Sequence, residues 1–438
     1  MKFPGKRKSK HYFPPHKGKK YPAQRGFPSE KAAPLQRRFY IVGIDQPLVD
    51  IEVEATEELL HQYGLSKGES VILNDALAED LYNELIEKKL IRGQYAGGAV
   101  GNTLHNYTVL TDTSAVLLGT INRNISVGDY AYKYLCRTSS LVDLAYLKPC
   151  DMPMGRALCF VLPNGERSFG ISKGCMNQLT PDYIPEEVIK GASLLLLTAF
   201  LLRDPEAPIY EATMHAISLA HKYNVPIVLN LGTSFLIERN PDYWKKMIQE
   251  HINVVAMNET EAEVLTGQDA PLLALKSTLE WCDMVLLTNG EKGLYLGAHC
   301  DEEMLRHTSH TLYSKSVPEY NRYEYSRVMR KDDCENPIRI YSHINPYQGG
   351  PETIQTTNGA GDGALSALLH DMAANHFHQT LFPTVPKHKA PFITYSSISQ
   401  ICKYANRVSY EILNQNSPRM MYGLPEREDS LEEAYWDM

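Results

Sequence analysis

The stretch TTNGAGDGALSALLH, residues 356–370, decides how the fold of this chain is interpreted. Three small residues, Gly359, Ala360 and Gly361, lead directly into Asp362, and an apolar helical pattern follows at once. A helix N-terminus presents unpaired N–H groups and a positive partial charge, and glycines let an anion approach the backbone closely. We therefore predict an anion hole at this turn, with a phosphate undergoing transfer as its guest.

A carboxylate beside a phosphate is electrostatically unfavourable. Its presence there therefore indicates that it has a chemical task. Accepting the proton of an attacking hydroxyl is such a task, and it typically contributes about 10²–10⁴-fold to the rate. Asp362 is therefore predicted to be a general base, with the amides of Gly359, Ala360 and Gly361 stabilising charge on the transferring group. The competing interpretation is that Asp362 only caps the helix, because Asp is a favoured N-cap.

Two other phosphate-binding motifs fit this chain poorly. GAGDGA matches a dinucleotide fingerprint loosely, but the preceding ETIQTT is polar where that fingerprint needs a buried strand. A Walker A sequence does not occur anywhere in the chain, so a kinase of this sequence is not a P-loop kinase.

The composition is that of a globular protein. The chain has 438 residues, 43% of them hydrophobic and 22% charged. Its longest apolar run, Ala192–Leu202, is too short to span a bilayer, and the first residues lack the apolar core of a signal peptide. We expect a cytoplasmic protein without a membrane partner. The eight cysteines form no C-x-x-C pair, so buried, reduced thiols are expected.

The charge is unevenly distributed. Residues 1–38 carry 12 Lys and Arg but one acid, which leaves 32 of the 44 bases and 51 of the 52 acids for the rest of the chain. A body this acidic repels polyanions, so nucleic acid is not expected as a ligand. We expect a basic, flexible N-terminal tail over 1–38 and an acidic C-terminal tail over 426–438.

Continuous apolar runs recur between helical patterns along residues 39–425. The two clearest helical patterns cover 211–224 and 260–267. Apolar strands that alternate with helices predict an α/β fold: a three-layer α/β/α domain around a mostly parallel sheet. The runs that we expect to be strands are Phe39–Ile44, Ser114–Gly119, Ser193–Thr198, Pro226–Leu231, Asn253–Asn258 and Met284–Thr288.

Two segments alternate apolar and polar residues instead. These are 46–56 and 156–172, and the second contains an Asn164-Gly165 pair typical of a hairpin turn. They predict a small antiparallel β lid beside the main sheet. Residues 301–350 are polar and weakly patterned, and we interpret them as an insertion.

Three further segments combine small and polar residues: AGGAVGN (Ala96–Asn102), NETE (Asn258–Glu261) and TNGEKG (Thr288–Gly293). Each follows an apolar strand or forms a turn. Open α/β sheets bind their ligands at the carboxyl edge of the strands, which is where these segments are expected.

Together these segments resemble the carbohydrate and purine-nucleoside kinase family of the ribokinase fold. Its two signatures correspond to Gly97-Gly98…Asn102 and to 356–362, although Thr356 stands where the family has an Asp. The resemblance implies ATP as phosphoryl donor with Mg²⁺, and it leaves a monovalent cation such as K⁺ open. The implied ATP-site residues are Thr288, Gly290, Gly293, Asn358 and Asn406, and Asn258 and Glu261 are implied to hold the Mg²⁺ through water.

GIDQPLVDI (Gly43–Ile51) is similar to the first strand and turn of the nucleoside kinases in this family. That similarity implies that Asp50 accepts from the two ribose hydroxyls and that a purine nucleoside such as inosine or guanosine is phosphorylated on its 5′-hydroxyl. A sugar kinase of the same fold and a regulator without catalysis stay open as alternatives, as does a homo-oligomer. The implied nucleoside-site residues are Asp45, Gln46, Asp50, Gly97, Gly98, Asn102 and Arg203.

Overall fold

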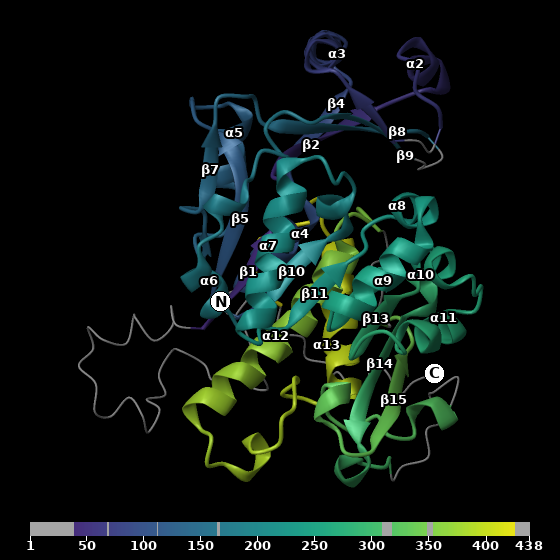
Figure 1. The fold of residues 1–438 in the computed structure, drawn as a ribbon. Coiled ribbons are helices and arrows are strands. Elements are labelled where there is room, and N and C mark those ends of the chain that lie inside the picture. The colour runs from purple at the N-terminus through teal and green to yellow at the C-terminus, as the bar shows by residue number, and fades with distance from the viewer. Residues whose placement is uncertain are drawn as a thin grey trace, which may run out of the picture.

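The computed structural model describes residues 39–67, 70–111, 113–163, 167–308, 318–347 and 354–424. The predicted tails at 1–38 and 426–438 and the Asn164-Gly165 turn therefore lie outside the described residues. Two sheets organise the chain, a large one in the body and a smaller one above it (Figure 1).

The central sheet contains all six predicted strands. Its order is β15-β14-β13-β12-β11-β10-β1-β5-β6, with β7 also paired to β5. In this spatial order, β13, β12, β11, β10, β1, β5 and β6 are parallel to one another. β14 and β15 are antiparallel to their neighbours. The bounds are β1 Tyr40–Ile44, β5 Ser114–Asn122, β6 Val142–Asp143, β7 Leu147–Cys150, β10 Leu195–Thr198, β11 Ile227–Asn230, β12 Val254–Asn258, β13 Met284–Thr288, β14 Leu294–Asp301 and β15 Pro337–Ile344.

Each face of this sheet is covered by helices, because alternate strand residues point to opposite faces. Ile41 and Leu196 belong to one hydrophobic core, with α4 (Ala99–Thr111), α12 (Ala360–Leu381) and α13 (Ile398–Leu413). Val42 and Leu195 belong to the other core. The helices on that second face are α6 (Glu186–Lys190), α7 (Pro208–Lys222), α8 (Ser234–Arg239), α9 (Pro241–His251), α10 (Glu259–Thr266) and α11 (Pro271–Thr278). The predicted α/β/α arrangement is thus confirmed, including both predicted helices.

The smaller sheet has the order β3-β9-β8-β2-β4. The expectation of an antiparallel lid was wrong in part, because β2 pairs with β8 and β3 pairs with β9 in parallel. The antiparallel pairs are β2 with β4 and β8 with β9. A long crossover through the central sheet separates β2 from β8, so the chain can re-enter the lid in the same direction. The bounds are β2 Leu48–Glu54, β3 Ser70–Leu73, β4 Ile91–Gly97, β8 Gly155–Val161 and β9 Arg167–Ser172.

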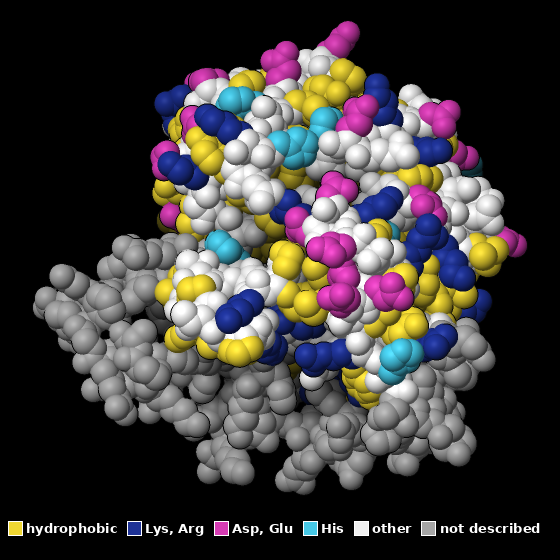
Figure 2. Space-filling view, turned by 60° about the horizontal axis from the view of Figure 1, so that its bottom comes forward, with side chains coloured by type: hydrophobic (Ala, Val, Ile, Leu, Met, Phe, Trp, Pro, Cys, Tyr) yellow, Lys and Arg dark blue, Asp and Glu magenta, His cyan; other side chains and the backbone are white. Residues whose placement is uncertain are grey.

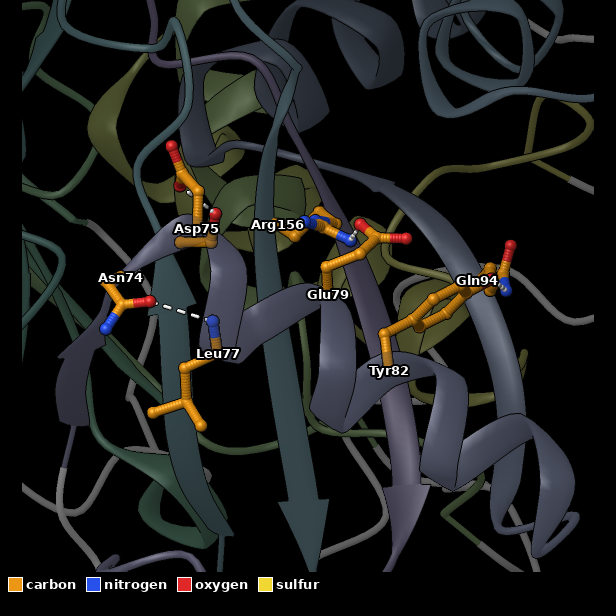
Figure 3. Close-up of polar contacts among 8 residues, drawn as sticks. Asn74, Asp75, Leu77, Glu79, Tyr82, Gln94 and Arg156 are labelled. Atoms are coloured by element: carbon orange, nitrogen blue, oxygen red, sulfur yellow. Dashed lines mark hydrogen bonds and ion pairs between the residues drawn. The ribbon is translucent and has the colours of Figure 1, made fainter.

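Helices α2 (Glu57–Gln62) and α3 (Asp75–Glu87) lie over the lid on the side away from the body (Figure 1). The side chain of Asn74 caps α3 by accepting from the N–H of Leu77 at 2.8 Å (Figure 3). The hydroxyl of Ser172 donates to Asp75 at 2.6 Å, which fastens the start of α3 to strand β9.

A buried arginine ties two helices to the lid sheet. The Nη1 of Arg156, on β8, donates to Oε2 of Glu79 at 2.6 Å (Figure 3). Its guanidinium lies 6.0 Å from the ring centroid of Tyr82 and 5.5 Å from that of Tyr130. Tyr130 opens α5 (Tyr130–Cys136), which contacts the lid strands β4 and β2, so this cation–π contact fastens α5 to strand β8.

The described part of residues 301–350, expected as an insertion, extends the central sheet through β15. Within them Arg327 is buried, and its Nη2 donates to Oδ1 of Asn375 on α12 at 2.8 Å. Its Nε donates to the carbonyl of Thr394 at 3.0 Å. The segment is therefore packed onto the body by buried polar contacts, for which its polar sequence supplies the donors.

The eight cysteines are free, as expected, but only six are buried: Cys334 is partly exposed and Cys136 is exposed. Across the described ranges no helix is both long and apolar enough to cross a membrane. On the face in Figure 2, acidic and basic side chains are interspersed over the described part of the surface, the pattern of a solvated protein exterior.

Candidate active site

Asp362 lies in the first turn of α12, whose N-cap is Gly359. Its carboxylate does not cap the helix. Oδ1 accepts from the Nδ2 of Asn230 at 3.3 Å, and Oδ2 accepts from the Nδ2 of Asn102 at 3.5 Å. These partners come from the end of β11 and from α4, so the carboxylate is held across the fold rather than along its own helix.

Burial raises the pKa of Asp362 to about 7. The carboxylates of Asp45 and Asp50 raise it further, whereas the amide of Asn102 and the guanidinium of Arg419 lower it. A carboxyl group with a pKa near neutrality can take up and release a proton under physiological conditions, which is what general-base catalysis requires.

The glycine turn in front of Asp362 is built for close approach. Gly359 has a φ of +78°, and a Cβ there would lie 2.5 Å from the Cβ of Pro418. The hydroxyl of Ser409, on α13, donates to the carbonyl of Ala360 at 2.8 Å and fixes the first turn. Around the position that a Cβ of Gly361 would take, the described residues place no atom within 4 Å. The backbone at Gly361 is therefore open to a ligand.

A second carboxylate, Asp45, lies at the end of β1 and is 1% exposed. Its Oδ2 accepts from the N–H of Gly101 at 2.7 Å. Gly98 has a φ of +97°, and a Cβ there would lie 2.2 Å from the same oxygen. Burial raises the pKa of Asp45 to about 6, opposed by the Gly101 amide and by Arg419. The Gly97-Gly98 turn therefore packs directly on Asp45.

Sequence reasoning missed Arg419, which is 4% exposed. Its Nε donates to Oδ1 of Asn102 at 2.9 Å, and its Nη1 donates to the hydroxyl of Thr138 at 2.7 Å. Its guanidinium lies 4.9 Å from the ring centroid of Tyr134. Because Arg419 occupies the amide oxygen of Asn102, the NH₂ of that amide faces Asp362.

Asp362, Asp45 and Asn102 line one cavity of about 250 Å³, whereas Arg419, Ala360 and Gly361 are not among its lining residues. Four carboxylates line it, those of Asp45, Asp50, Glu52 and Asp362, together with one cation, Arg203. Gln46 also lines it and donates through Nε2 to Asn177. Gly97 stands behind this lining, because a Cβ there would lie 2.6 Å from an oxygen of Asp50. The remaining lining residues are Leu48, Tyr95, Gly98, Ala99, Asn102, Cys159, Phe169, Ile171, Met176, Thr198, Phe200, Asn358, Gly359 and Pro418.

Most residues implied for ATP lie outside this cavity, although Asn358 lines it. Thr288 ends β13 and is paired in register with Asn258, so both stand at the carboxyl edge of the sheet. Gly293 has a φ of +92°, and a Cβ there would lie 2.0 Å from the carbonyl oxygen of Ile344. Gly290 also has a positive φ, of +46°. Asn406 is engaged by the backbone, since its Nδ2 donates to the carbonyl of Asn345 at 2.7 Å.

Asn258 and Glu261, implied to hold Mg²⁺ through water, form a capping box at the start of α10. The Glu261 carboxylate accepts from the N–H of Asn258 at 3.0 Å and from its Nδ2 at 2.9 Å. Burial raises the pKa of Glu261 to about 7, so a cation nearby would favour its ionised form. The described residues contain no group of three or more His, Cys, Asp or Glu that could hold a metal directly.

This fold and site define a sugar-kinase type of phosphotransferase, and the chain belongs to that family. The model described as "pfkB family carbohydrate kinase" matches residues 68–310. The guanosine-inosine kinase of Escherichia coli (strain K12) is 54% identical over 438 residues, covering 100% of both chains. The family resemblance predicted from the motifs is therefore confirmed.

Solved structures support the fold. A probable sugar kinase protein from Rhizobium etli CFN 42 matches with a TM-score of 0.65 and 18% identity, covering 89% of this chain and 97% of that one. An adenosine kinase from Sinorhizobium meliloti matches with a TM-score of 0.62 and 18% identity, covering 88% and 97%. At this identity the likeness establishes the shared architecture.

Proposed function

We propose that this protein transfers the γ-phosphoryl group of ATP to the 5′-hydroxyl of guanosine and inosine, giving GMP and IMP. The observation that carries the proposal is the identity of 54% over the whole chain with the guanosine-inosine kinase of Escherichia coli. The cavity supports it, because a carboxyl group of near-neutral pKa stands there at a helix N-terminus beside carboxylates suited to a polyhydroxylated substrate. The reaction returns free nucleosides to the nucleotide pool.

The ribose is held by Asp50. One carboxylate can accept from two vicinal hydroxyls at once, which matches the 2′- and 3′-hydroxyls of a ribonucleoside. Asp50 lies on the lid strand β2 and lines the cavity opposite the body. Gly97 leaves room for that carboxylate, and Gly98, Asn102, Asp45 and Gln46 complete the wall around the sugar.

Asp362 takes the proton of the 5′-hydroxyl as that oxygen attacks the γ-phosphorus, and the bond to the β-phosphate oxygen breaks. The amides of Gly359, Ala360 and Gly361 donate to the oxygens of the transferring group. One preorganised donor of this kind is typically worth about 2.7–4 kcal/mol of transition-state stabilisation. The open space at Gly361 is compatible with a phosphate placed there.

ATP lies along the carboxyl edge of the sheet. Thr288, Gly290 and Gly293 shape its binding site, and Asn358 and Asn406 lie nearby. When bound, Mg²⁺ neutralises the phosphate charges, and Asn258 and Glu261 would hold its water ligands. The lid strands β2, β8 and β9 cover the nucleoside and exclude water, which would otherwise accept the phosphoryl group.

The test is ATP consumption by the purified protein with Mg²⁺ and one acceptor at a time: inosine, guanosine, adenosine, cytidine or ribose. Turnover with inosine and guanosine but not with ribose is expected. Turnover with ribose alone would favour a sugar kinase and would overturn the role of Asp50. Absence of turnover with all five would favour a regulator without catalysis.

A further inference from the structure

The nucleoside cavity contains polar atoms that the protein itself leaves unpaired. Thr198, at the end of β10, is 1% exposed. Within the described ranges its hydroxyl and the Nη2 of Arg203 are buried without a hydrogen-bond partner. Both residues line the cavity, at opposite ends of the short helix η4 (Ala199–Leu202). Buried polar groups are nearly always paired in native proteins, so this end of the cavity is built to meet a ligand.

Apolar side chains line the same cavity as Arg203, and we call the part that they line the apolar slot. Phe200, on the same short helix, and Met176 line it from the body, and Phe169 and Ile171 line it from the lid strand β9. The position of the Phe200 ring depends on Gly232, because a Cβ at Gly232 would lie 2.9 Å from the ring carbon Cε2. Aromatic rings in such slots stack on nucleobases without discriminating among them. The slot thus accounts for purine binding but not for the choice of purine.

The proposed function fixes which end of the nucleoside reaches this slot. The 5′-hydroxyl lies at Asp362 and the ribose at Asp50, so the base occupies the remaining part of the cavity. Among the lining residues that part contains a single cation, Arg203, while the four carboxylates belong to Asp45, Asp50, Glu52 and Asp362. The cation is therefore the group of the cavity that attracts acceptor atoms of the base.

Guanine and hypoxanthine share one feature that adenine lacks. Both present O6 and N7 as adjacent acceptors, whereas adenine presents an amino donor beside N7. An arginine side chain carries its N–H donors in a planar fork that matches two adjacent acceptors, and it repels an amino donor.

We propose that Arg203 is the specificity-determining residue for the base: it donates to O6 and N7 and so selects 6-oxopurine nucleosides over 6-aminopurine nucleosides. Phe200 supplies the stacking surface, and Arg203 supplies the discrimination. This inference rests on the proposed function and names the chemical class of base that the same site accepts.

The experiment compares the wild-type protein with Arg203→Met and Arg203→Lys. For each, kcat/KM is measured with inosine, guanosine, adenosine and purine riboside, which lacks a substituent at C6, and KM is measured for ATP. One bidentate contact of this kind corresponds to about 5- to 150-fold in discrimination. We expect Arg203→Met to lower kcat/KM for inosine and guanosine by a factor in that range, to lower it less for purine riboside, which retains N7 but has no O6, and to leave the KM for ATP unchanged. For Arg203→Lys, kcat/KM with inosine and guanosine should lie between the values of the wild-type protein and Arg203→Met, because an ammonium group does not match both acceptors.

A second substrate tests the N7 contact, and a second arginine controls for charge. With 7-deazaguanosine the wild-type protein should lose activity relative to guanosine, whereas Arg203→Met should show no such difference. Arg123→Met is the matched control, since Arg123 is an exposed residue paired with Asp151 at 2.8 Å and does not line the cavity. It should retain the wild-type preference.

The possible outcomes separate the explanations. An equal loss with every nucleoside and a raised KM for ATP would place Arg203 on a phosphate and would overturn the proposal. An equal loss of kcat/KM with every nucleoside, together with a lower melting temperature in both variants, would assign Arg203 a structural role. That result would also overturn the proposal. A wild-type protein that phosphorylates no purine nucleoside would refute the proposed function itself, whereas a wild-type protein that is active but keeps its base preference in Arg203→Met would refute the base contact alone.

Discussion

Replacing Arg419 should change the pH at which the protein works. Its guanidinium holds the amide oxygen of Asn102 at 2.9 Å, and the NH₂ of that amide faces Asp362. Both interactions favour the ionised carboxylate of Asp362, whose pKa is about 7. The Arg419→Met variant loses the positive charge and frees the amide to turn its oxygen toward Asp362, so the pKa of Asp362 should rise.

The size of the change follows from this geometry. A hydrogen bond to a charged group is worth about 1.5–3 kcal/mol, and a shift of one pKa unit corresponds to about 1.4 kcal/mol. We take about half of the upper value, 3 kcal/mol, as the part of this free energy that stabilises ionised Asp362 through Asn102. Losing that stabilisation raises the pKa of Asp362 by about one unit. Because the proposed base, Asp362, acts in its ionised form, kcat/KM should rise with pH through this pKa. At pH 7 activity should then fall about 5-fold, and at pH 9 it should be nearly restored.

The assay is kcat/KM for inosine between pH 6 and pH 9.5, with melting temperatures measured in parallel. Thr138→Val is the control, because it removes the 2.7 Å contact with the Nη1 of Arg419 but keeps the charge and the bond to Asn102. That variant should show the wild-type pH profile. Arg419 also lowers the pKa of Asp45, and a more readily protonated Asp45 repels Asp362 less, so the observed shift should stay within about one unit. A uniform loss of activity at every pH would refute this reasoning and would leave Arg419 a packing role.

Three further predictions concern the same site. Asp362→Asn should lower kcat by at least about 10²-fold while the KM for ATP stays close to the wild-type value, and near-normal turnover would show that the carboxylate is not the base. Asp50→Ala should raise the KM for inosine far more than that for ATP, and unchanged KM values would contradict the ribose contact. Gly98→Ala should reduce the free energy of unfolding in urea by about 1–3 kcal/mol, because its Cβ would lie 2.2 Å from Asp45. Gly128→Ala, with a φ of +92° but open space around it, measures backbone strain alone, and an equal effect in both variants would exclude the close contact as the cause.

The parts of the fold that could be predicted are those with a local pattern. The strands of the central sheet are continuous apolar runs because both of their faces are covered by helices. The pairing of β2 with β8 left no such pattern, since alternation shows which face is buried but not which strand lies alongside or in which direction.

The residues of the site also separate into those that the sequence could predict and those that it could not. The glycine turns and Asp362 were recognisable because backbone geometry and chemistry restrict those positions to particular residues. Arg419 and Asn230 were not, because they reach the site through contacts with distant residues. Arg419 binds Asn102, which is 317 positions away, and Asn230 binds Asp362, which is 132 positions away. A single polar residue that finds its partner only in the folded chain has no period or spacing that a sequence could show.

The place of Arg419 in the chain has a consequence for how the protein is made. Synthesis on the ribosome proceeds from the N-terminus, so the turn that contains Asn102 is complete long before Asp362 and Arg419 emerge. Pro418, which packs against Gly359, and Arg419 both follow α13, the last helix of the described residues. A nascent or truncated chain that stops within α13 therefore has every residue of the turn at 359–361. It lacks the contact with Arg419 that holds the amide of Asn102 toward the carboxylate of Asp362. The contact that orients the amide of Asn102 therefore forms only when translation is nearly finished.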